Sequence, residues 1–251
     1  MNILKKSIQF IKREGFFVFL KVVFDRIYYL LARMIIAPYW ARKIKKINFE
    51  NRKELLNFAF RKMPKFFRPS QIEEEISLLV EILWDRKPKT ILEIGTAGGG
   101  TLFLFCKIAD STAKIISIDL PWGKFGRGYP KWETLFYRSF KNNNQRLFFL
   151  RKNSHQEETL EALKYILNGE GIDFLFIDGD HSYEGVKKDF EMYAPLVKKG
   201  GIIALHDIVE HPKETGCGAA KFWREIKKDY KKREIIKEED QKWAGIGVIY
   251  K

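Results

Sequence analysis

The amino-acid sequence predicts an α/β fold: a seven-stranded, mostly parallel sheet with helices on both faces, preceded by a helical extension at the N-terminus. The first observation is that short apolar segments alternate with helical patterns from residue 90 onward. This alternation is typical of parallel sheets covered on both faces. The second is a glycine-rich turn directly after the first apolar segment, at residues 95–100. The third is a basic segment with helical periodicity ahead of the alternating part.

The N-terminal extension is basic and amphipathic. Residues 1–46 contain eleven Lys or Arg residues and two acidic residues, so most of the excess behind the formal net charge of +14 lies in this segment. Apolar residues recur at helical spacing between positions 16 and 35 and share one broad face. Pro38 is expected to end this helix, and residues 50–69 to form a charged connection. The expected domains are therefore the extension at 1–69 and an α/β domain at 70–251.

Two interpretations of the amphipathic helix remain open. It can lie on an anionic membrane surface, or it can pack on the α/β domain or on a second subunit of a homo-oligomer. Charged residues interrupt its apolar runs before the roughly 20 residues that a crossing helix requires, and no cleavage site indicates a signal peptide. Cys106 and Cys217 have neither metal-ligand nor disulfide spacing, which favours a reducing compartment. The expected location is cytoplasmic, with a peripheral position on the inner face of the membrane as one alternative.

The remaining elements follow in order along the chain. A helix is expected at 71–84, and further helical patterns occupy 102–108 and 183–193. Seven segments have the length and composition of strands, and the last two are expected to form a terminal hairpin. These segments are 90–94, 114–119, 147–150, 173–177, 201–205, 233–236 and 246–250.

The glycine-rich turn has the features of a nucleotide-binding loop. Gly95 permits a tight turn from strand to helix, and the glycines at 98–100 let a ligand approach backbone N–H groups that a Cβ would shield. Ala97 occupies the second glycine position of the dinucleotide pattern, which argues against a nicotinamide site. Asp119 ends the second strand and is placed to accept hydrogen bonds from two ribose hydroxyls.

Glu93, the glycine turn and Asp119 together resemble motif I, and the acid on the next strand, of class I methyltransferases that use S-adenosylmethionine. The resemblance implies a Rossmann-like sheet whose last strand is antiparallel. It also implies that the cofactor contacts the turn, the acid of the second strand, the polar pair after the third strand and the acid after the fourth. These positions are Glu93, Gly95, Thr96, Gly98, Gly99, Asp119, Asn153, Ser154 and Asp178.

Two longer phrases, 176–189 and 200–207, resemble small-molecule O-methyltransferases of the cephalosporin-hydroxylase-like and macrolide-sugar type, over about residues 70–251. In the metal-using members, acids after the fourth and fifth strands bind Mg²⁺, and the matching positions are Asp178, His206 and Asp207. An imidazole suits Mn²⁺, Fe²⁺ or Zn²⁺ better than it suits Mg²⁺. Two interpretations stay open: a divalent metal such as Mg²⁺ or Mn²⁺, or a His206 that only forms hydrogen bonds.

His181 is the candidate general base, with Asp178 as the second catalytic position. An imidazole near its ordinary pKa of about 6.5 can take a proton from an alcohol while a methyl group moves. The alternative is that Asp180 and His181 only cap the helix that begins at Tyr183. The loops 120–132 and 208–218 are expected to bind substrate, with Trp122, Tyr129 and Trp132 either stacking on it or anchoring the loop.

The predicted function is transfer of a methyl group from S-adenosylmethionine to a hydroxyl of a small-molecule, glycan or lipid-linked sugar acceptor. One alternative, prompted by the basic charge, is RNA methylation, but that charge lies on an apolar-faced helix and not on a recognisable RNA-binding module. The sequence Asp178-Gly-Asp-His181 also differs from the Pro-Pro-aromatic loop of many nucleic-acid methyltransferases. The other alternative is a membrane-recruited binding protein that retains the fold without turnover.

Overall fold

The structure is a computed structural model that describes residues 16–121, 128–142 and 144–251. Its centre is a seven-stranded sheet in the order β3-β2-β1-β4-β5-β7-β6. Strands β1 to β5 pair in parallel, whereas β7 is antiparallel to both β5 and β6. The predicted sheet, including its antiparallel last strand, is thereby confirmed. The strands are β1 (Thr90–Ile94), β2 (Lys114–Ile118), β3 (Arg146–Leu150), β4 (Ile172–Ile177), β5 (Val197–His206), β6 (Lys231–Ile235) and β7 (Ile246–Tyr250).

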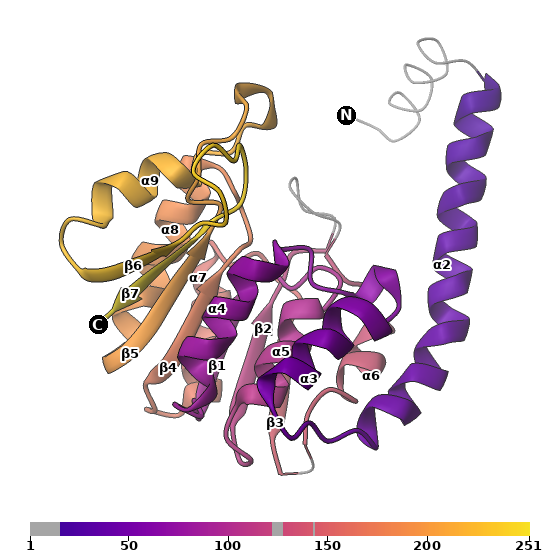
Figure 1. Cartoon of the computed structure of the whole chain (residues 1–251), viewed down its shortest axis with the longest axis horizontal. Helices are drawn as coiled ribbons and strands as arrows, with labels where there is room; N and C mark the ends of the chain where they lie inside the picture. The colour runs from indigo at the N-terminus through magenta and orange to yellow at the C-terminus, as the bar shows by residue number, and fades with distance from the viewer. Residues whose placement is uncertain (1–15, 122–127, 143) are drawn as a thin grey trace.

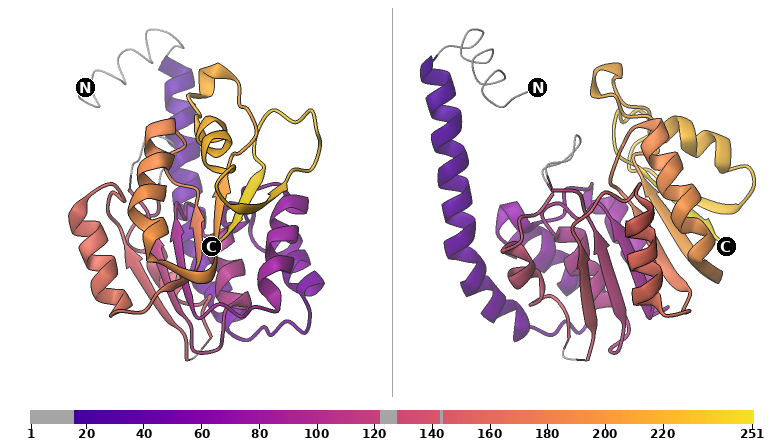
Figure 2. Two further views of the ribbon diagram at one scale, coloured as in Figure 1. Left: turned by 90° about the vertical axis from the view of Figure 1, so that its left-hand side faces the viewer. Right: turned by 180° about the vertical axis from the view of Figure 1, so that it is seen from behind.

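Helices cover both faces of the sheet (Figures 1 and 2). One face carries α3 (Arg52–Asn57), the π-helix η1 (Phe58–Lys62), the 3-10 helix η2 (Lys65–Phe67), α4 (Glu73–Trp84), α5 (Gly100–Ile108) and α6 (Glu133–Tyr137). The other face carries α7 (Glu157–Leu167), α8 (Tyr183–Tyr193) and α9 (Ala219–Ile226). Two further 3-10 turns are η3 (Ala194–Leu196) and η4 (Lys213–Thr215).

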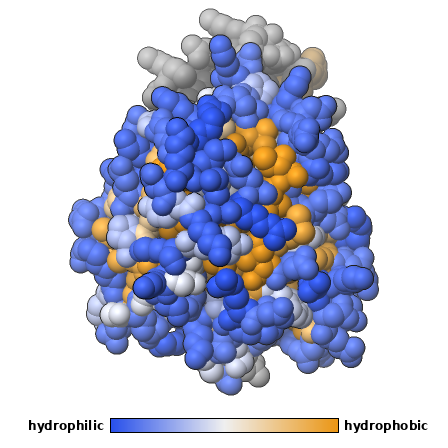
Figure 3. All heavy atoms as spheres, turned by 60° about the vertical axis from the view of Figure 1, so that its left-hand side comes forward, coloured by the Kyte–Doolittle hydropathy of each residue, from blue (hydrophilic) through white to orange (hydrophobic). Residues whose placement is uncertain are grey.

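The central strands are buried on both sides, so apolar residues follow one another along them. In β4, Phe174 and Phe176 pack into the hydrophobic cluster on one face, and Leu175 and Ile177 pack into the cluster on the other. Successive side chains of a strand point to opposite faces, so a continuous apolar run serves two cores at once. On the surface shown in Figure 3, hydrophilic residues surround a strip of apolar residues.

Residues 50–69 are part of the folded core and do not form the charged connection that we expected. Asn51 caps α3 by accepting a hydrogen bond from the backbone N–H of Glu54 at 3.0 Å. Leu55 and Phe67 are fully buried in the same cluster as the sheet, and Phe58 is nearly so. The apolar residues of this segment were obscured in the sequence by the lysines and arginines between them. The domain boundary after residue 69 stays a prediction.

Helix α2 (Phe16–Lys45) continues through Pro38, so the expected end at this proline is wrong. Ala37 and Ile44 are buried, and the Trp40 ring lies 6.0 Å from that of Phe58. These contacts hold the last turns against the core and offset the hydrogen bond that proline removes. The N-terminal part of α2 extends past the sheet edge at which β1 to β5 end (Figures 1 and 2). Among the described residues, no helix has the length and apolar character needed to cross a membrane.

Candidate active site

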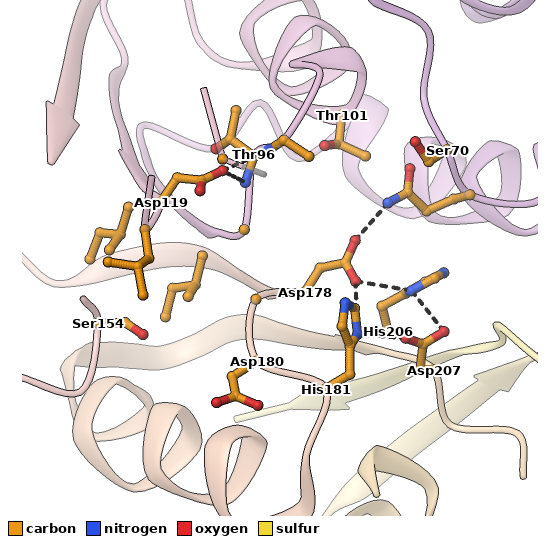
Figure 4. A pocket seen from close by; sticks show the side chains of 18 of the residues that line it. Ser70, Thr96, Thr101, Asp119, Ser154, Asp178, Asp180, His181, His206 and Asp207 are labelled. Atoms are coloured by element: carbon orange, nitrogen blue, oxygen red, sulfur yellow. Dashed lines mark hydrogen bonds and ion pairs between the residues drawn. The ribbon is translucent and has the colours of Figure 1, made fainter. Parts of the chain in front are cut away.

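A cavity of about 530 Å³ opens at the carboxyl ends of β1, β2, β4 and β5. Ligands of parallel α/β sheets occupy this edge, and the volume lies in the range of small-molecule sites. All four histidines of the chain line this cavity: His155, His181, His206 and His211. Figure 4 shows the polar side chains that converge there from several loops.

The glycine turn after β1 forms one wall. Gly95 has a φ of +88°, and its N–H donates to the carbonyl of Ile118 at 2.9 Å. A Cβ on Gly95 would overlap the backbone of Asp178, so no other residue fits between the two strands. Gly98 lines the cavity. Gly99 is not among the lining residues, and its Cβ would instead meet the ring of Tyr137.

Asp119 both fixes this turn and lines the cavity. Its Oδ2 accepts hydrogen bonds from the backbone N–H groups of Thr96, at 2.9 Å, and Ala97, at 2.7 Å (Figure 4). Burial raises the pKa of this carboxyl, and the two N–H groups oppose that shift. With Oδ2 engaged by the turn, Oδ1 is the oxygen that a hydroxylated ligand would meet.

Glu93 lies behind the turn. Its side chain is fully buried, its Oε2 accepts from the Thr96 hydroxyl at 2.5 Å, and it is not among the residues that line the cavity. Oε1 has no hydrogen-bond partner among the described residues. Burial raises the pKa of Glu93 to about 8, because the charged form loses its hydration. The structure therefore places this predicted residue beneath Thr96, where it supports the turn.

His206 lies between two carboxylates. Its Nδ1 is 3.0 Å from Oδ1 of Asp178 and 3.1 Å from Oδ1 of Asp207 (Figure 4). Burial alone would lower the pKa of this imidazole, but the two carboxylates outweigh burial and raise it well above its ordinary value. Asp178 is also held by Gln71, whose Nε2 donates to Oδ2 at 2.6 Å.

His181 is oriented by Asp207. The His181 Nδ1 lies 2.7 Å from Oδ2 of Asp207, which leaves Nε2 as the ring atom that can accept a proton. Burial opposes the charged form of His181, yet the carboxylates of Asp207 and Asp178 raise its pKa. For Asp207 itself, hydrogen bonds from His181 and His206 outweigh burial and hold the pKa well below its usual range. Asp207 has a φ of +63°, a left-handed conformation that is uncommon outside glycine.

The helix cap next to His181 is a different residue. Ser182 caps α8, because its Oγ accepts from the backbone N–H of Gly185 at 3.1 Å. Asp180 supports this cap by accepting from the Ser182 backbone N–H at 3.0 Å and from its hydroxyl at 2.7 Å. Of the alternative in which Asp180 and His181 cap this helix, Asp180 takes part through Ser182, whereas His181 is not the cap.

Two groups of side chains have the spacing of metal ligands. Among the described residues, ligand atoms of Asp178, His181 and Asp207 lie within 4.8 Å of one another, as do those of Asp207, His211 and Cys217. The predicted set contains His206 in place of His181, and there the imidazole Nδ1 sits between the two carboxylates. Burial raises the pKa of the Cys217 thiol to about 11, so the sulfur carries its proton at neutral pH.

The far end of the cavity is lined by Asn153, Ser154 and His155. Asn153 Oδ1 accepts from the backbone N–H of His155 at 2.9 Å, which shapes this loop. His155 Nε2 lies 3.3 Å from Oδ1 of the fully buried Asp189, and this carboxylate raises the pKa of the imidazole. Sequence alone identifies His155 only as a loop residue, since Asp189 is far from it along the chain.

Sequence reasoning missed other parts of the cavity. Arg68 to Gln71 line it ahead of α4, and Trp243 lines it from the C-terminal half. His211 and Cys217 line it from the predicted substrate loop 208–218, although the sequence did not single them out as ligands. Of the predicted substrate loop, residues 122–127 lie outside the described part of the chain. Tyr129 is buried, and its hydroxyl lies 2.9 Å from that of Ser117, so it anchors the loop and does not stack on a ligand.

Comparisons with known proteins agree with this architecture. Residues 92–208 match the model of a methyltransferase domain. The chain is 29% identical over 143 residues to an uncharacterized protein of Sinorhizobium fredii, covering 56% of this chain and 15% of that protein. It is 32% identical over 128 residues to an uncharacterized protein of Acanthamoeba polyphaga mimivirus, covering 51% and 55%. The chain thus spans about half or less of the length of these relatives.

Among solved structures, the chain resembles the O-methyltransferase TomG of Streptomyces achromogenes, which was crystallised with S-adenosylmethionine. The TM-score is 0.54 at 15% identity, covering 86% of this chain and 95% of TomG. At this identity the likeness concerns the fold alone. Together with the sheet order, it shows that the chain has the Rossmann-like fold of the class I methyltransferases, and the segment that matches the methyltransferase model lies within this fold.

Proposed function

We propose that the protein transfers a methyl group from S-adenosylmethionine to a hydroxyl group of a small-molecule acceptor. The observation that carries the proposal is the pair of His181 and Asp207, with 2.7 Å between Nδ1 and Oδ2, on the same cavity as the glycine turn. A hydroxyl loses its proton when it is methylated, so a base held in one orientation beside a cofactor cavity is the group that the reaction needs.

The cavity fits the cofactor at two places. Asp119 presents Oδ1 where ribose hydroxyls can donate to it, while Oδ2 is engaged by the turn. Thr96 and Gly98 line the wall at which the methionine end would bind, and Asn153 and Ser154 line the end that would receive adenine. Glu93 and Gly99 would contribute indirectly. Glu93 accepts a hydrogen bond from Thr96, and Gly99 leaves space for the ring of Tyr137. Asp178 also lines the cavity and would lie near the reacting centre.

The bound cofactor supplies a methyl group on a sulfonium sulfur. In the proposed step the acceptor oxygen forms a bond to the methyl carbon, the bond from carbon to sulfur breaks, and its electron pair stays on sulfur. His181 Nε2 takes the hydroxyl proton. Asp207 keeps the proton of Nδ1 in place and stabilises the imidazolium that results.

A divalent ion at Asp178, His206 and Asp207 stays a prediction. Two carboxylates and one imidazole suit Mn²⁺ better than Mg²⁺, which prefers oxygen ligands. Such an ion would hold the acceptor hydroxyl and favour its deprotonated form. If the reaction uses this ion, activity should fall after dialysis against EDTA and return with added Mn²⁺.

We further propose a glycan or lipid-linked sugar as acceptor, met at the inner face of a membrane. The support is α2, on which Phe17, Phe24 and Ile35 are exposed within a segment rich in Lys and Arg. Sedimentation with anionic vesicles tests this idea. Binding to neither anionic nor neutral vesicles would contradict it.

The central test replaces His181 with Ala. We expect turnover, measured as release of S-adenosylhomocysteine with a panel of sugars, catechols and lipid extracts, to fall by about 10²-fold or more. Cofactor affinity measured by isothermal titration should change little, because Asp119 and the glycine turn remain. Normal turnover in this variant would remove His181 from the mechanism. Absence of cofactor binding by the unaltered protein would remove the proposed function itself.

A further inference from the structure

Asp207, His211 and Cys217 form a group of mixed ligands in the wall of the cavity. Their carboxylate oxygen, imidazole nitrogen and sulfur all lie within 4.8 Å of one another, and Asp207 Oδ1 is 3.1 Å from His211 Nε2. Two ligands of a tetrahedral ion, at about 2.0 Å for oxygen or nitrogen and about 2.3 Å for sulfur, stand roughly 3.3 to 3.5 Å apart. The distance between Asp207 and His211 is already near this spacing, and the Cys217 sulfur, within 4.8 Å of both, would approach them on binding.

We propose that Asp207, His211 and Cys217 bind a transition-metal ion of the Zn²⁺ type, with the fourth position open to the cavity. The inference rests on the proposed function only for the use of the ion, because binding itself needs no substrate. Thiolate and imidazole ligands select this class of ion and exclude Mg²⁺ and Ca²⁺. On binding, the Cys217 sulfur exchanges its proton for the ion, and the proton passes to solvent.

The loop that carries these ligands is shaped to bring them together. His211 and Cys217 flank the 3-10 turn η4, and Gly216, with a φ of +69°, turns the chain back after it. The half-buried His211 and Cys217 both line the cavity, as does the buried Asp207. Residues six positions apart thereby face the same point beside the strand end that supplies Asp207.

The hydrogen bonds of His211 direct its Nε2 toward Asp207. Its Nε2 lies 3.2 Å from the backbone nitrogen of Ala244, from which it accepts, and 3.1 Å from the Asp207 carboxylate. A neutral ring has either a lone pair or a proton at Nε2, so it cannot accept from Ala244 and donate to Asp207 at the same time. In the accepting form the lone pair of Nε2 lies next to the Asp207 carboxylate, and an ion that both groups bind would take this lone pair in place of the Ala244 N–H.

A buried polar atom without a partner lies beside the same group. Among the described residues, Nε2 of His206 has neither a hydrogen bond nor an ion pair, whereas its Nδ1 is paired with Asp178. Both side chains are less than a tenth exposed, and both belong to the cavity wall beside Asp207. Buried polar groups without hydrogen bonds are costly, and an ion nearby is one of the ordinary ways in which proteins offset that cost.

The proposed ion is coupled to the base. The backbone N–H of Gly218, next to Cys217, donates to the carbonyl of His181 at 2.7 Å, and Asp207 holds the ring of His181 from the other side. An acceptor hydroxyl bound at the open position of the ion would lie next to Nε2 of His181, and the ion would favour loss of the hydroxyl proton. The two loops thus present base and ion to one hydroxyl.

Cobalt titration of the full chain tests the site directly. Protein stripped with EDTA and kept reduced is titrated with Co²⁺, and we expect one equivalent to give thiolate-to-cobalt charge-transfer absorption together with the visible bands of tetrahedral Co²⁺. Zn²⁺ should displace the cobalt and abolish the spectrum, whereas Mg²⁺ should not. Absence of the charge-transfer absorption in the unaltered protein would overturn the proposal.

Two substitutions and one control assign the ligands. Cys217→Ser should abolish the charge-transfer absorption, and His211→Ala should weaken Co²⁺ binding by at least about 10-fold. Cys106→Ala is the matched control, because Cys106 is buried in α5 and does not line the cavity. Charge-transfer absorption that survives in Cys217→Ser would overturn the assignment. All three variants are checked for S-adenosylhomocysteine binding, which reports folding and the cofactor site independently of the ion.

Discussion

Asp207 is the side chain on which three of the four histidines converge. His181 approaches Oδ2 at 2.7 Å, and His206 and His211 approach Oδ1 at 3.1 Å each. The side chain of Asp207 must point toward all three imidazoles. The left-handed backbone conformation of Asp207, with a φ of +63° at the end of β5, sets this orientation. The orientation of the candidate base therefore depends on one unusual backbone conformation.

At the same scale, Glu93 makes stability depend on pH. Its pKa of about 8 in the folded chain exceeds the ordinary 4.5 of a glutamic acid, so between these values the native state holds a proton that the unfolded state lacks. This contribution to stability is fully present below pH 4.5 and is lost as the pH rises through 8. In urea unfolding between pH 5 and 8, Glu93→Gln should flatten the decline in unfolding free energy by up to about 1.4 kcal/mol per pH unit. Identical slopes would show that Glu93 is already ionised in the fold.

Some site residues follow from the sequence and others do not. Asp119, Asp178, His181, His206 and Asp207 are predictable, because each lies just after a strand and parallel strands end at one edge of the sheet. The positions of His211 and Cys217 depend on how an irregular loop folds, which no periodicity reports. The pairing of His155 with Asp189 is likewise invisible, since it joins a loop to a helix that only tertiary packing brings near.

At the scale of elements, the turn between β1 and α5 is held from three sides. Asp119 binds its N–H groups, Glu93 holds Thr96 from below, and the Tyr137 hydroxyl donates to the carbonyl of Ala97 at 2.9 Å. The Tyr137 ring fills the space next to Gly99, where a Cβ would come within 2.7 Å of it. The shape of the cofactor wall is therefore set before any ligand arrives.

We expect Gly99→Ala to weaken S-adenosylhomocysteine binding by at least about 10-fold. The new methyl group displaces Tyr137, and Tyr137 holds the turn through Ala97. Gly200→Ala is the control, because Gly200 also has a positive φ, of +82°, but nothing lies within 4 Å of its Cβ. Both variants pay a backbone cost of about 1–2 kcal/mol, which a thermal melt measures. Equal affinities in calorimetry would show that the Tyr137 contact does not shape the site.

The seven strands were predictable because short apolar runs alternate with helical patterns, and the helices at 102–108 and 183–193 because their apolar residues recur at helical spacing. The helices α6, α7 and α9 had no predicted range. The N-terminal elements were not predictable, for two physical reasons. Pro38 lies in a helix whose last turns are held by tertiary contacts of Ala37, Trp40 and Ile44, which override a local preference. Residues 52–67 form a short α-helix, a π-helix and a 3-10 helix, in which cations stand between buried apolar residues. The spacing of the apolar residues therefore follows no single helical period.

For the whole molecule, the segment before α4 belongs to both the core and the cavity. Leu55, Phe58 and Phe67 are buried among the sheet residues, while Gln71 holds Asp178 and Arg68 lines the cavity. The domain boundary expected after residue 69 would separate these core and cavity residues from the sheet that they contact.

A chain shortened to residues 70–251 should therefore be largely unfolded. Loss of each buried Leu or Phe contact costs about 2–5 kcal/mol, and the three together approach the roughly 5–15 kcal/mol that stabilises an ordinary domain. A chain of residues 36–251 keeps these contacts and should retain a cooperative thermal transition and S-adenosylhomocysteine binding. Far-ultraviolet circular dichroism and calorimetry compare the two. A folded, binding-competent 70–251 would contradict this account of the core.

One outer strand also limits how copies of the chain can associate. β6 ends the sheet next to β7, and Lys231, Lys232 and Arg233 follow one another along it, all exposed. If two copies paired edge to edge through β6, these cations would lie opposite one another. Repulsion between the like charges opposes such edge-to-edge pairing. The charges of β6 thereby disfavour aggregation through this edge. Any lasting self-association would have to use a different surface, such as the apolar side of α2.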